Sequence, residues 1–379
     1  MPWKAQNVMS LKHEFVLLAR QEGANRRELC RRFEISPQTA YKWLQRFAQE
    51  GAEGLQERSR RPASSPALSS AGVESAVIAL RRQHPAWGGR KISRRLLDLG
   101  QAQVAPSTVT SILHRHGLIT AQASQAATPW TRFERSEPNA LWQADFKGHF
   151  ETAQGRCLPL TVIDDHSRFN LALHACAKAT TEVVQAQMER VFSRYGLPVQ
   201  INFDNGAPWG SPKAPGQLSE LGVWLIRLGV VVSHSRPYHP QTNGKDERFH
   251  RSLDVEVLQG RSFESLAKVQ AALDHWRQVY NHERPHEALQ MATPITRYRP
   301  SARRLPGRLG SPEYASRDEV RTVGCNGELR FGNGRYKVTN ALRGHKVAIR
   351  PRPNQDGLFD VFFAHHRCLT IDLRQPDNF

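Results

Sequence analysis

The chain has 379 residues, of which 39% are hydrophobic and 23% charged, and it carries a net charge of +18. The length predicts about two to four domains, and the strong basicity predicts a polyanionic partner, nucleic acid above all. No run of about 18 apolar residues occurs, which excludes a transmembrane helix. Residues 1–10 lack the pattern of a secretory signal, so we expect a cytoplasmic protein without a membrane partner.

Cysteine usage and the distribution of charge narrow the class further. The five cysteines are scattered and form no C-x-x-C pair, which argues against a disulfide framework or a structural zinc site. The net charge is +11 over residues 1–135, +1 over residues 136–299 and +6 over residues 300–379. We therefore expect the two ends to bind phosphate and the balanced middle to use its acids for other chemistry.

Residues 1–51 are predicted to form a helix-turn-helix domain that binds DNA. Apolar residues recur at helical spacing in three segments. Ser36 followed by Pro37 indicates the start of the third helix, because serine caps free N–H groups and proline has none. We expect the outer face of this helix to read a major groove, through Gln38, Thr39, Lys42 and Arg46.

Residues 52–69 are predicted to be a basic linker, because proline, serine and arginine dominate and the apolar spacing disappears. Its arginines Arg58, Arg60 and Arg61 allow two interpretations. They either enter the minor groove of DNA or belong to a solvated flexible linker, and the sequence favours neither.

Residues 70–119 repeat the plan of the first unit and are predicted to form a second helix-turn-helix domain. Pro106 and Ser107 indicate the start of its third helix. We expect that helix to face DNA with Thr108, Thr110, Ser111 and Arg115.

After a second predicted linker, residues 120–138, the pattern changes to strands. Three antiparallel strands, followed by alternating helices and strands, predict a mixed sheet flanked by helices over residues 139–299. A third linker, residues 300–319, leads to short strand-like runs over residues 320–379. Turns such as Gly332-Asn333-Gly334 separate these runs, and we expect a small basic β-barrel. The fold class is therefore multidomain: all-α units, an α/β core and an all-β end.

Two aspartates in the α/β region are candidates for metal-dependent chemistry. Asp145 lies inside a strand, where a half-buried carboxylate is costly unless it meets a cation; the alternative is an outward-facing acid on an edge strand. Asp204 ends a strand, where open α/β sheets place ligands. Its alternative is a turn-forming aspartate in Asp-Asn-Gly.

A third acid, Glu247, lies in the first turn of a predicted helix, where the helix dipole alone favours an acid. On a helical wheel Phe249, Leu253 and Val257 share one face. Glu247 falls outside that face, close to Arg251, whereas Asp246 falls beside it. We therefore expect Glu247 to be the solvent-reachable carboxylate and Arg251 to meet phosphate.

In combination these features resemble bacterial insertion-sequence transposases with a retroviral-integrase-like, ribonuclease H-like core. The resemblance covers most of the chain and implies that Asp145, Asp204 and Glu247 are the D-D-E triad. It rests on Trp142-Gln143-Ala144-Asp145, on Val162 to Arg168, on Phe203-Asp204-Asn205-Gly206, on His239 to Phe249, and on Tyr280 to Leu289.

The chain departs from the family pattern in two respects. Asp204 and Glu247 are separated by 42 residues, more than is usual, and we expect residues 207–216 to hold the excess. Asp246 stands where the family commonly has an apolar residue, so it is an alternative to Glu247 as third ligand. Asp164 and Asp165, at a strand end, are expected to shape a turn.

The resemblance implies DNA cleavage and joining with two Mg²⁺ ions, with Mn²⁺ as a substitute. Asp145 would contact both ions, and Asp204 and Glu247 one each. Water would free a 3′-OH at the element's end, and the 3′-OH would attack target DNA. The implied partners are double-stranded DNA and further copies of the chain, and Lys245, Arg248 and Arg251 are further candidates for DNA contact.

Two alternative functions remain open. A DNA-binding regulator that lacks catalytic activity would need the helix-turn-helix units but not the three acids. A structure-specific nuclease of the ribonuclease H type would need the acids but not two units that read sequence.

Overall fold

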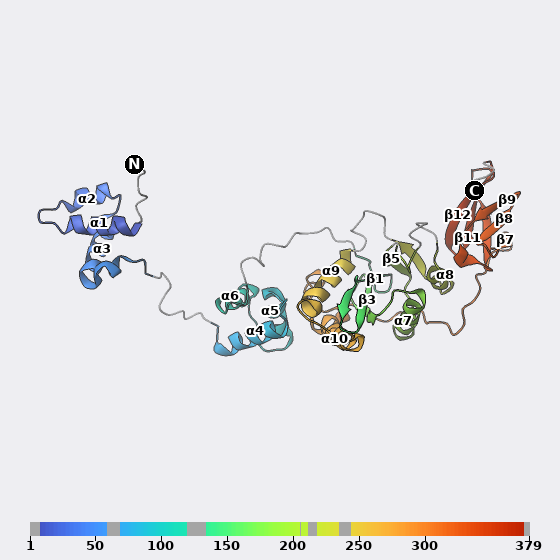
Figure 1. Cartoon of the computed structure of the whole chain (residues 1–379), viewed down its shortest axis with the longest axis horizontal. Helices are drawn as coiled ribbons and strands as arrows, with labels where there is room; N and C mark the ends of the chain where they lie inside the picture. Colours follow the sequence, from blue (N-terminus) through green and yellow to red (C-terminus); the bar gives the residue numbers. More distant parts are fainter. Residues whose placement is uncertain are drawn as a thin grey trace. The chain divides into compact units, whose positions relative to one another are not determined.

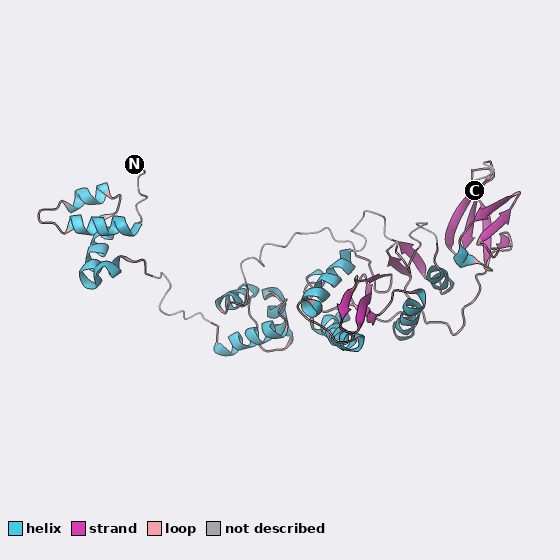
Figure 2. Ribbon diagram, viewed as in Figure 1, coloured by secondary structure: helices cyan, strands magenta, loops and turns pink. Residues whose placement is uncertain are grey.

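The computed structural model describes residues 8–58, 69–119, 134–204, 206–210, 218–234 and 244–374. The chain divides into two compact units, Met1–Ser69 and Ser70–Phe379. The first is helical, and the second runs from three helices through a mixed sheet with helices to C-terminal β-sheets (Figures 1 and 2). This confirms the predicted succession of fold classes. Among the helices of the described part of the chain, none has both the length and the apolarity to span a membrane.

The first unit is a three-helix domain closed by a short 3₁₀ turn. Its elements are α1 (Val8–Ala19), α2 (Arg26–Arg32), α3 (Pro37–Glu50) and η1 (Gly51–Leu55). The Ser36 hydroxyl accepts the N–H of Thr39 at 3.1 Å, which confirms the predicted cap of α3. Phe15 and Trp43 are buried between the helices, so the opposite face of α3 is left to solvent.

The second unit begins with another three-helix group: α4 (Ala71–Gln83), α5 (Gly89–Asp98) and α6 (Pro106–Arg115). Trp87, Ile92 and Val109 are completely buried in its core. Gly89 is required at the start of α5, because a Cβ there would lie 2.6 Å from the backbone carbonyl oxygen of Pro106. Arg95 of α5 forms an ion pair of 2.5 Å with Glu283, which belongs to the α/β region.

The α/β region is built on a six-stranded mixed sheet. Its strands are β1 (Leu141–Phe146), β2 (Phe150–Thr152), β3 (Gly155–Asp164), β4 (Asn170–Cys176), β5 (Gln200–Phe203) and β6 (Val231–His234). The order is β2-β3-β1-β5-β6, with β4 on β3. β1 pairs antiparallel with β3 and parallel with β5. The central position of β1 brings the ends of β1 and β5 to neighbouring places in the sheet.

Helices supply an apolar layer to each face of this sheet. The elements are α7 (Thr181–Tyr195), α8 (Glu220–Arg227), α9 (Gly244–Leu253), α10 (Leu266–Gln278), the π-helical turns η4 (Asp254–Leu258) and η5 (Val279–Glu283), and the 3₁₀ turns η6 (Glu287–Leu289) and η7 (Pro294–Thr296). Leu160 and Val162 pack with α7 and α8, whereas Ile163 packs with α9 and α10. Trp276 and Tyr280 are buried in the second layer.

The C-terminal region has a four-stranded sheet and a separate hairpin. Its elements are β7 (Glu319–Thr322), β8 (Glu328–Phe331), β9 (Gly334–Lys337), η8 (Asn340–Leu342), β10 (Lys346–Pro351), β11 (Leu358–Phe363) and β12 (His366–Asp372). The sheet order is β12-β11-β10-β7, and β8 pairs with β9. Within residues 318–374 no pairing joins β7 to β12, so the predicted closed barrel is not confirmed.

The apolar side of the C-terminal sheets packs against helices of the α/β region, so it is buried without the strands closing into a barrel. Val347, Val361 and Phe363 share one continuous core with α7 and α8. All residues of α8 from Leu221 to Ile226 are buried, as expected for a helix that is apolar on all sides. The C-terminal sheets are therefore attached to the α/β region through α8.

Candidate active site

Asp145 lies near the end of the central strand β1, directly opposite Thr161 of β3. One carboxylate oxygen accepts the N–H of Phe146 at 2.7 Å. Burial, followed by the negative charge of Asp204, raises the pKa of Asp145 to about 6, and the charge of Glu247 acts in the same direction. A carboxyl group with such neighbours is a candidate for function because its charge is unfavourable without a cation.

Asp204 follows β5, the parallel neighbour of β1. Its Oδ1 accepts the N–H of Gly206 at 3.0 Å, so this aspartate does form the local turn that its sequence context suggested. The turn leaves Oδ2 3.1 Å from the position that a Cβ on residue 206 would take, which makes glycine favourable there. Burial raises the pKa of Asp204, and the Gly206 N–H partly opposes this shift.

Glu247 and Asp246 have opposite environments in the first turn of α9. Glu247 is exposed, whereas Asp246 is only 1% exposed. The helical wheel therefore predicted their orientations correctly. Neither carboxylate oxygen of Asp246 has a hydrogen-bond partner within the described residues. Burial, and then the charge of Asp145, raises the pKa of Asp246 well above its usual range, which favours its neutral form.

The three predicted acids are electrostatic neighbours, since the charges of both Asp204 and Glu247 act on Asp145. Across the described ranges, however, no three histidine, cysteine, aspartate or glutamate side chains are arranged to hold a metal ion. The donor types fit Mg²⁺, which prefers carboxylate oxygens, and a cation would remove the unfavourable effect that raises the pKa of Asp145. The residues thus suit a divalent cation in chemistry and in charge.

Two residues outside the predicted triad, Thr161 and His250, connect the strand of Asp145 with α9. The hydroxyl of Thr161 donates to the carbonyl oxygen of Asp145 at 3.0 Å and lies 2.9 Å from Nε2 of His250. Burial, and then the charge of Lys147, lowers the pKa of His250 to about 4. No local pattern marks Thr161, because its partners come from another strand and from a distant helix.

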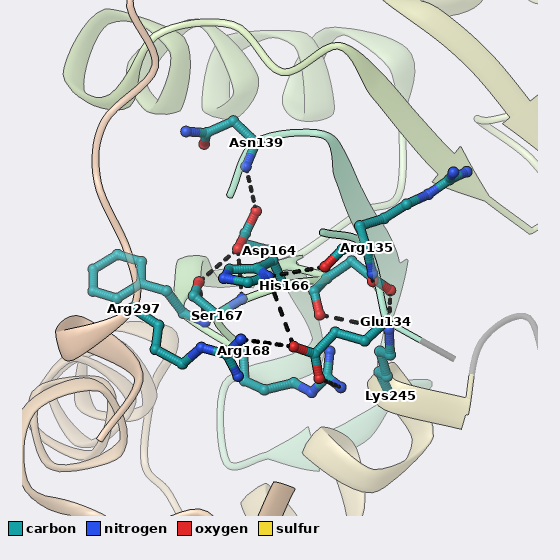
Figure 3. A network of polar contacts seen from close by, with 11 residues as sticks. Glu134, Arg135, Asn139, Asp164, His166, Ser167, Arg168, Lys245 and Arg297 are labelled. Carbon is teal, nitrogen blue, oxygen red and sulfur yellow. Dashed lines mark hydrogen bonds and ion pairs between the residues drawn. The ribbon is translucent and has the colours of Figure 1, made fainter. Parts of the chain in front are cut away.

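Asp164 shapes the turn that follows β3, as expected. Figure 3 shows its carboxylate between Asn139 and Ser167. It accepts the N–H of Asn139 at 2.7 Å, the N–H of Ser167 at 2.8 Å and the Ser167 hydroxyl at 2.6 Å. These bonds use both oxygens, and Asp164 is completely buried. Its role in the described structure is to hold the turn.

Asp165 has a wider role than its neighbour. Its carboxylate accepts the N–H of Arg135 at 2.8 Å and the side-chain amide of Gln143 at 3.0 Å. It also forms a close ion pair with Lys245 in the first turn of α9. Asp165 therefore links the segment before β1, through Arg135, to α9, the helix that carries Glu247.

Glu134 forms the other side of this network (Figure 3). Its carboxylate lies 3.0 Å from the guanidinium of Arg297 and 3.4 Å from that of Arg168. The Nδ1–H of His166 donates to the carbonyl of Arg135 at 2.8 Å. These contacts hold the chain where it enters the α/β region, and none of them is a hydrogen bond or ion pair with α9, although the charge of Glu134 also acts on Lys245.

The predicted DNA-reading residues of the first unit lie on or near α3. Gln38 and Lys42 are exposed, and the Lys42 ammonium lies 4.8 Å from the centre of the Trp43 ring. The hydroxyl of Thr39 lies 2.8 Å from that of Ser36, so it belongs to the helix cap. Arg46 is half-buried, and its guanidinium lies 5.3 Å from the centre of the same ring.

The linker arginines are only partly covered by the structure. Arg58 forms a close ion pair with Glu50, and Arg60 and Arg61 lie outside the described residues. The two interpretations of this linker therefore stay open.

On α6 the predicted DNA-facing residues differ in environment. Ser111 is exposed and Thr108 half-buried. Thr110 donates to the carbonyl of Pro106 at 2.8 Å and packs against Gly89, so it lies on the inner side of α6. Arg115 forms a close ion pair with Glu74. DNA contact by these residues stays a prediction.

Near Glu247 the basic residues are also not equivalent. Lys245 is engaged by Asp165, whereas Arg248 and Arg251 are exposed. Arg248 is at the limit of ion-pair distance from Glu287, 4.0 Å. The two exposed arginines follow Glu247 on the same helix, one and four residues after it, and both side chains are open to solvent.

Models of known protein families match successive parts of the chain. A helix-turn-helix domain matches residues 12–63 and a homeodomain-like domain residues 39–113. Two models described as integrase core domain match residues 135–240 and 228–294. The C-terminal domain of the IS481 family transposases matches residues 318–378.

Curated relatives include proteins of bacterial insertion elements and of retroviruses. The chain is 27% identical to an uncharacterized 31.7 kDa protein of insertion element IS407 from Burkholderia multivorans, over 41% of this chain and 54% of the relative. It is 22% identical to a 39.2 kDa protein of IS476 from Xanthomonas euvesicatoria, over 75% of each chain. The Pro-Pol polyprotein of simian foamy virus type 3 is 28% identical over 45% of this chain. The chain spans about half of the IS407 protein and 15% of the viral polyprotein.

Solved structures with partial similarity include retroviral integrases. The catalytic core domain of HTLV-2 integrase in complex with magnesium is 16% identical, with a TM-score of 0.33, over 43% of this chain and 99% of that one. A chain of the simian T-cell lymphotropic virus intasome is 17% identical, with a TM-score of 0.37, over 77% of this chain and 99% of that one.

Proposed function

Because the chain belongs to the bacterial insertion-sequence transposases with an integrase-like core, we propose that it binds the ends of a mobile element, cleaves the DNA there and joins it to target DNA. The observation that carries this proposal is the convergence of Asp145, Asp204 and Glu247. They come from β1, the end of β5 and α9, and the charges of the second and third act on the first.

The proposed reaction consists of two in-line substitutions at phosphorus. In the first, a water oxygen bonds to phosphorus, the bond to the 3′ oxygen breaks, and a free 3′-OH results. In the second, this 3′ oxygen bonds to a target phosphorus and the target's own 3′ oxygen leaves. One phosphodiester bond replaces another in the joining step, so no energy-rich cofactor is consumed.

Asp145, Asp204 and Glu247 would hold the metal ions. Two Mg²⁺ ions, or Mn²⁺ in their place, supply activation of the attacking oxygen and stabilisation of the leaving oxygen when bound at such a site. The chain itself contributes preorganised carboxylates: the Phe146 N–H orients Asp145, and the Gly206 N–H orients Asp204. The exposed Arg248 and Arg251 would bind the phosphates next to Glu247.

DNA binding is proposed for the two helical regions and for the basic C-terminal sheets. The exposed polar face of α3, including Gln38 and Lys42, would read bases in a major groove, and α6 would do the same with Ser111. The net charge of +6 over residues 300–379 supports phosphate contacts there that do not depend on sequence. At least two copies would act together on a pair of element ends.

Strand cleavage and joining with labelled element-end DNA and Mg²⁺ test this function. Wild type is compared with Glu247→Gln and with Asp246→Asn, a neighbour that differs in burial. We expect wild type and Asp246→Asn to cut and join, while Glu247→Gln binds the DNA but does not cut it. Full activity of Glu247→Gln together with loss in Asp246→Asn would exchange the roles of the two acids. Tight binding to an authentic end without cleavage by wild type would favour the inactive regulator.

A further inference from the structure

We propose that two polar contacts, Lys245 with Asp165 and His250 with Thr161, hold Glu247 in position against the strand of Asp145. In this proposal Asp165, Thr161, Lys245 and His250 do not contact the metal ions themselves; they act on the active site by holding Glu247 in place. This inference rests on the proposed function, in which Glu247 is the third metal ligand.

Glu247 needs such support because of where it lies in α9. The helix begins at Gly244, and its apolar anchors, Phe249 and Leu253, come after Glu247. Packing of these two side chains fixes the helix from its second turn onward. The first turn of a helix lacks a full set of internal hydrogen bonds, and Glu247 is itself exposed.

The first contact acts two residues before Glu247. The Lys245 ammonium pairs with an Asp165 carboxylate that is only 1% exposed in its side chain. That carboxylate cannot shift easily, because the backbone of Arg135 and the amide of Gln143 also donate to it. Gln143 belongs to β1, two residues before Asp145. The first turn of α9 is thus tied to the strand that carries the first acid.

The second contact acts three residues after Glu247, one turn along the helix. The Thr161 hydroxyl has one hydrogen, which it donates to the carbonyl of Asp145. Its other contact, 2.9 Å to Nε2 of His250, therefore requires that Nε2 carries the hydrogen and donates. Through Thr161, α9 is connected directly to the residue whose carboxylate Glu247 must face.

The two contacts lie on either side of Glu247 and both lead to β1. Together with the packing of Phe249 and Leu253, the two contacts fix the rotation of the first turn of α9 and its distance from the sheet. Groups that hold metal ligands in orientation typically change metal affinity by about 10–100-fold when they are removed. We expect the same range here.

The test is a titration of the full-length protein with Mn²⁺ in the absence of DNA. The EPR signal reports the concentration of free Mn²⁺ and so gives the amount bound. Thr161→Val removes the hydroxyl with little change in shape, and Thr161→Ser is its matched control because it keeps the hydroxyl. Lys245→Met removes the charge. Its control is Glu134→Gln, which removes a charge from the same network but breaks the ion pairs with Arg168 and Arg297 and leaves that between Lys245 and Asp165. Each variant is checked for its cooperative melting transition.

We expect Thr161→Val and Lys245→Met each to raise the Kd for Mn²⁺ by about 10–100-fold, while both controls stay within about threefold. Unchanged Mn²⁺ binding in the two test variants overturns the inference, as does an equal loss in Glu134→Gln. If Thr161→Val does not fold, His250→Phe, which keeps a ring but lacks the donor, replaces it under the same criteria.

Failure of the proposed function has a different signature. In that case Asp145→Asn would bind as much Mn²⁺ as wild type, or neither protein would bind it. Both proposals would then be wrong. If wild type binds Mn²⁺ through Asp145 but the test variants bind it equally well, the metal site stands and only the positioning role is wrong.

Discussion

The hydroxyl of Thr339 donates a buried hydrogen bond of 3.0 Å to the carbonyl of Leu218, and so joins the C-terminal sheets to the start of the α8 segment. Leu342 and Ala341 pack into the same core as α8. The C-terminal region is therefore a structural part of the second unit and not an attachment on a free linker.

This relationship predicts a large effect of a single truncation. Leu342 is completely buried, so Leu342→Ala is expected to lower the free energy of unfolding of the second unit by about 2–5 kcal/mol. Leu373→Ala, at a side chain that is 40% exposed, is the control and should change it by less than about 0.5 kcal/mol. Urea denaturation measures both. Equal stabilities of the two variants would show that the sheets do not share a core with α8.

A second prediction concerns metal ions and Asp145. Its pKa is raised to about 6 by burial and by neighbouring acids, so above that pH its charge destabilises the metal-free fold. In EDTA at pH 7.5, Asp145→Asn should therefore melt no lower than wild type. Addition of Mg²⁺ should raise the Tm of wild type but not that of the variant, because binding to the folded state stabilises it. A Tm rise of equal size in both proteins would place the metal elsewhere.

A third prediction concerns acid stability and His286. Burial, and then the charges of Arg284 and Lys91, lowers its pKa well below the usual value. Below about pH 6.5 the unfolded chain gains a proton that the folded state does not. The contribution of His286 to the free energy of unfolding is therefore fully present above that pH, and it is lost as the pH falls below it. His286→Gln should reduce the slope by up to about 1.4 kcal/mol per pH unit.

The slope is obtained from urea unfolding at several pH values between 5 and 7. His149→Gln, at an exposed histidine, is the matched control. A slope that His286→Gln and His149→Gln change equally would contradict the assignment to His286.

A fourth prediction separates base reading from phosphate binding on α3. Lys42→Ala should weaken binding to element-end and unrelated DNA alike. It should also lower the slope of log affinity against log salt concentration by about one, the value of one phosphate contact. Gln38→Ala should weaken binding to the element end by about 1–3 kcal/mol, with little change on unrelated DNA. Fluorescence anisotropy at several salt concentrations measures both. If Gln38→Ala weakens both DNAs equally, α3 does not read bases through Gln38.

Local sequence was sufficient where the physical cause is local. The cap of α3 by Ser36 depends on residues three apart, and the orientations of Glu247 and Asp246 follow from helical periodicity alone. The turn-forming role of Asp164 is also local, since Ser167 supplies two of its partners. The order of helical, mixed and all-β regions could be predicted in the same way, because each type of element has its own period of apolar residues.

Only the tertiary structure decided what depends on long-range pairing. Lys245 meets Asp165 across 80 residues and His250 meets Thr161 across 89, and no periodicity encodes which strand faces which helix. The sequence pattern also suggested a β-barrel, which is not confirmed: the described strands form a four-stranded sheet and a separate hairpin, and their apolar residues share a core with α8. Apolar alternation determines that a face must be buried, but the partner that buries it is chosen by the packing of the whole unit.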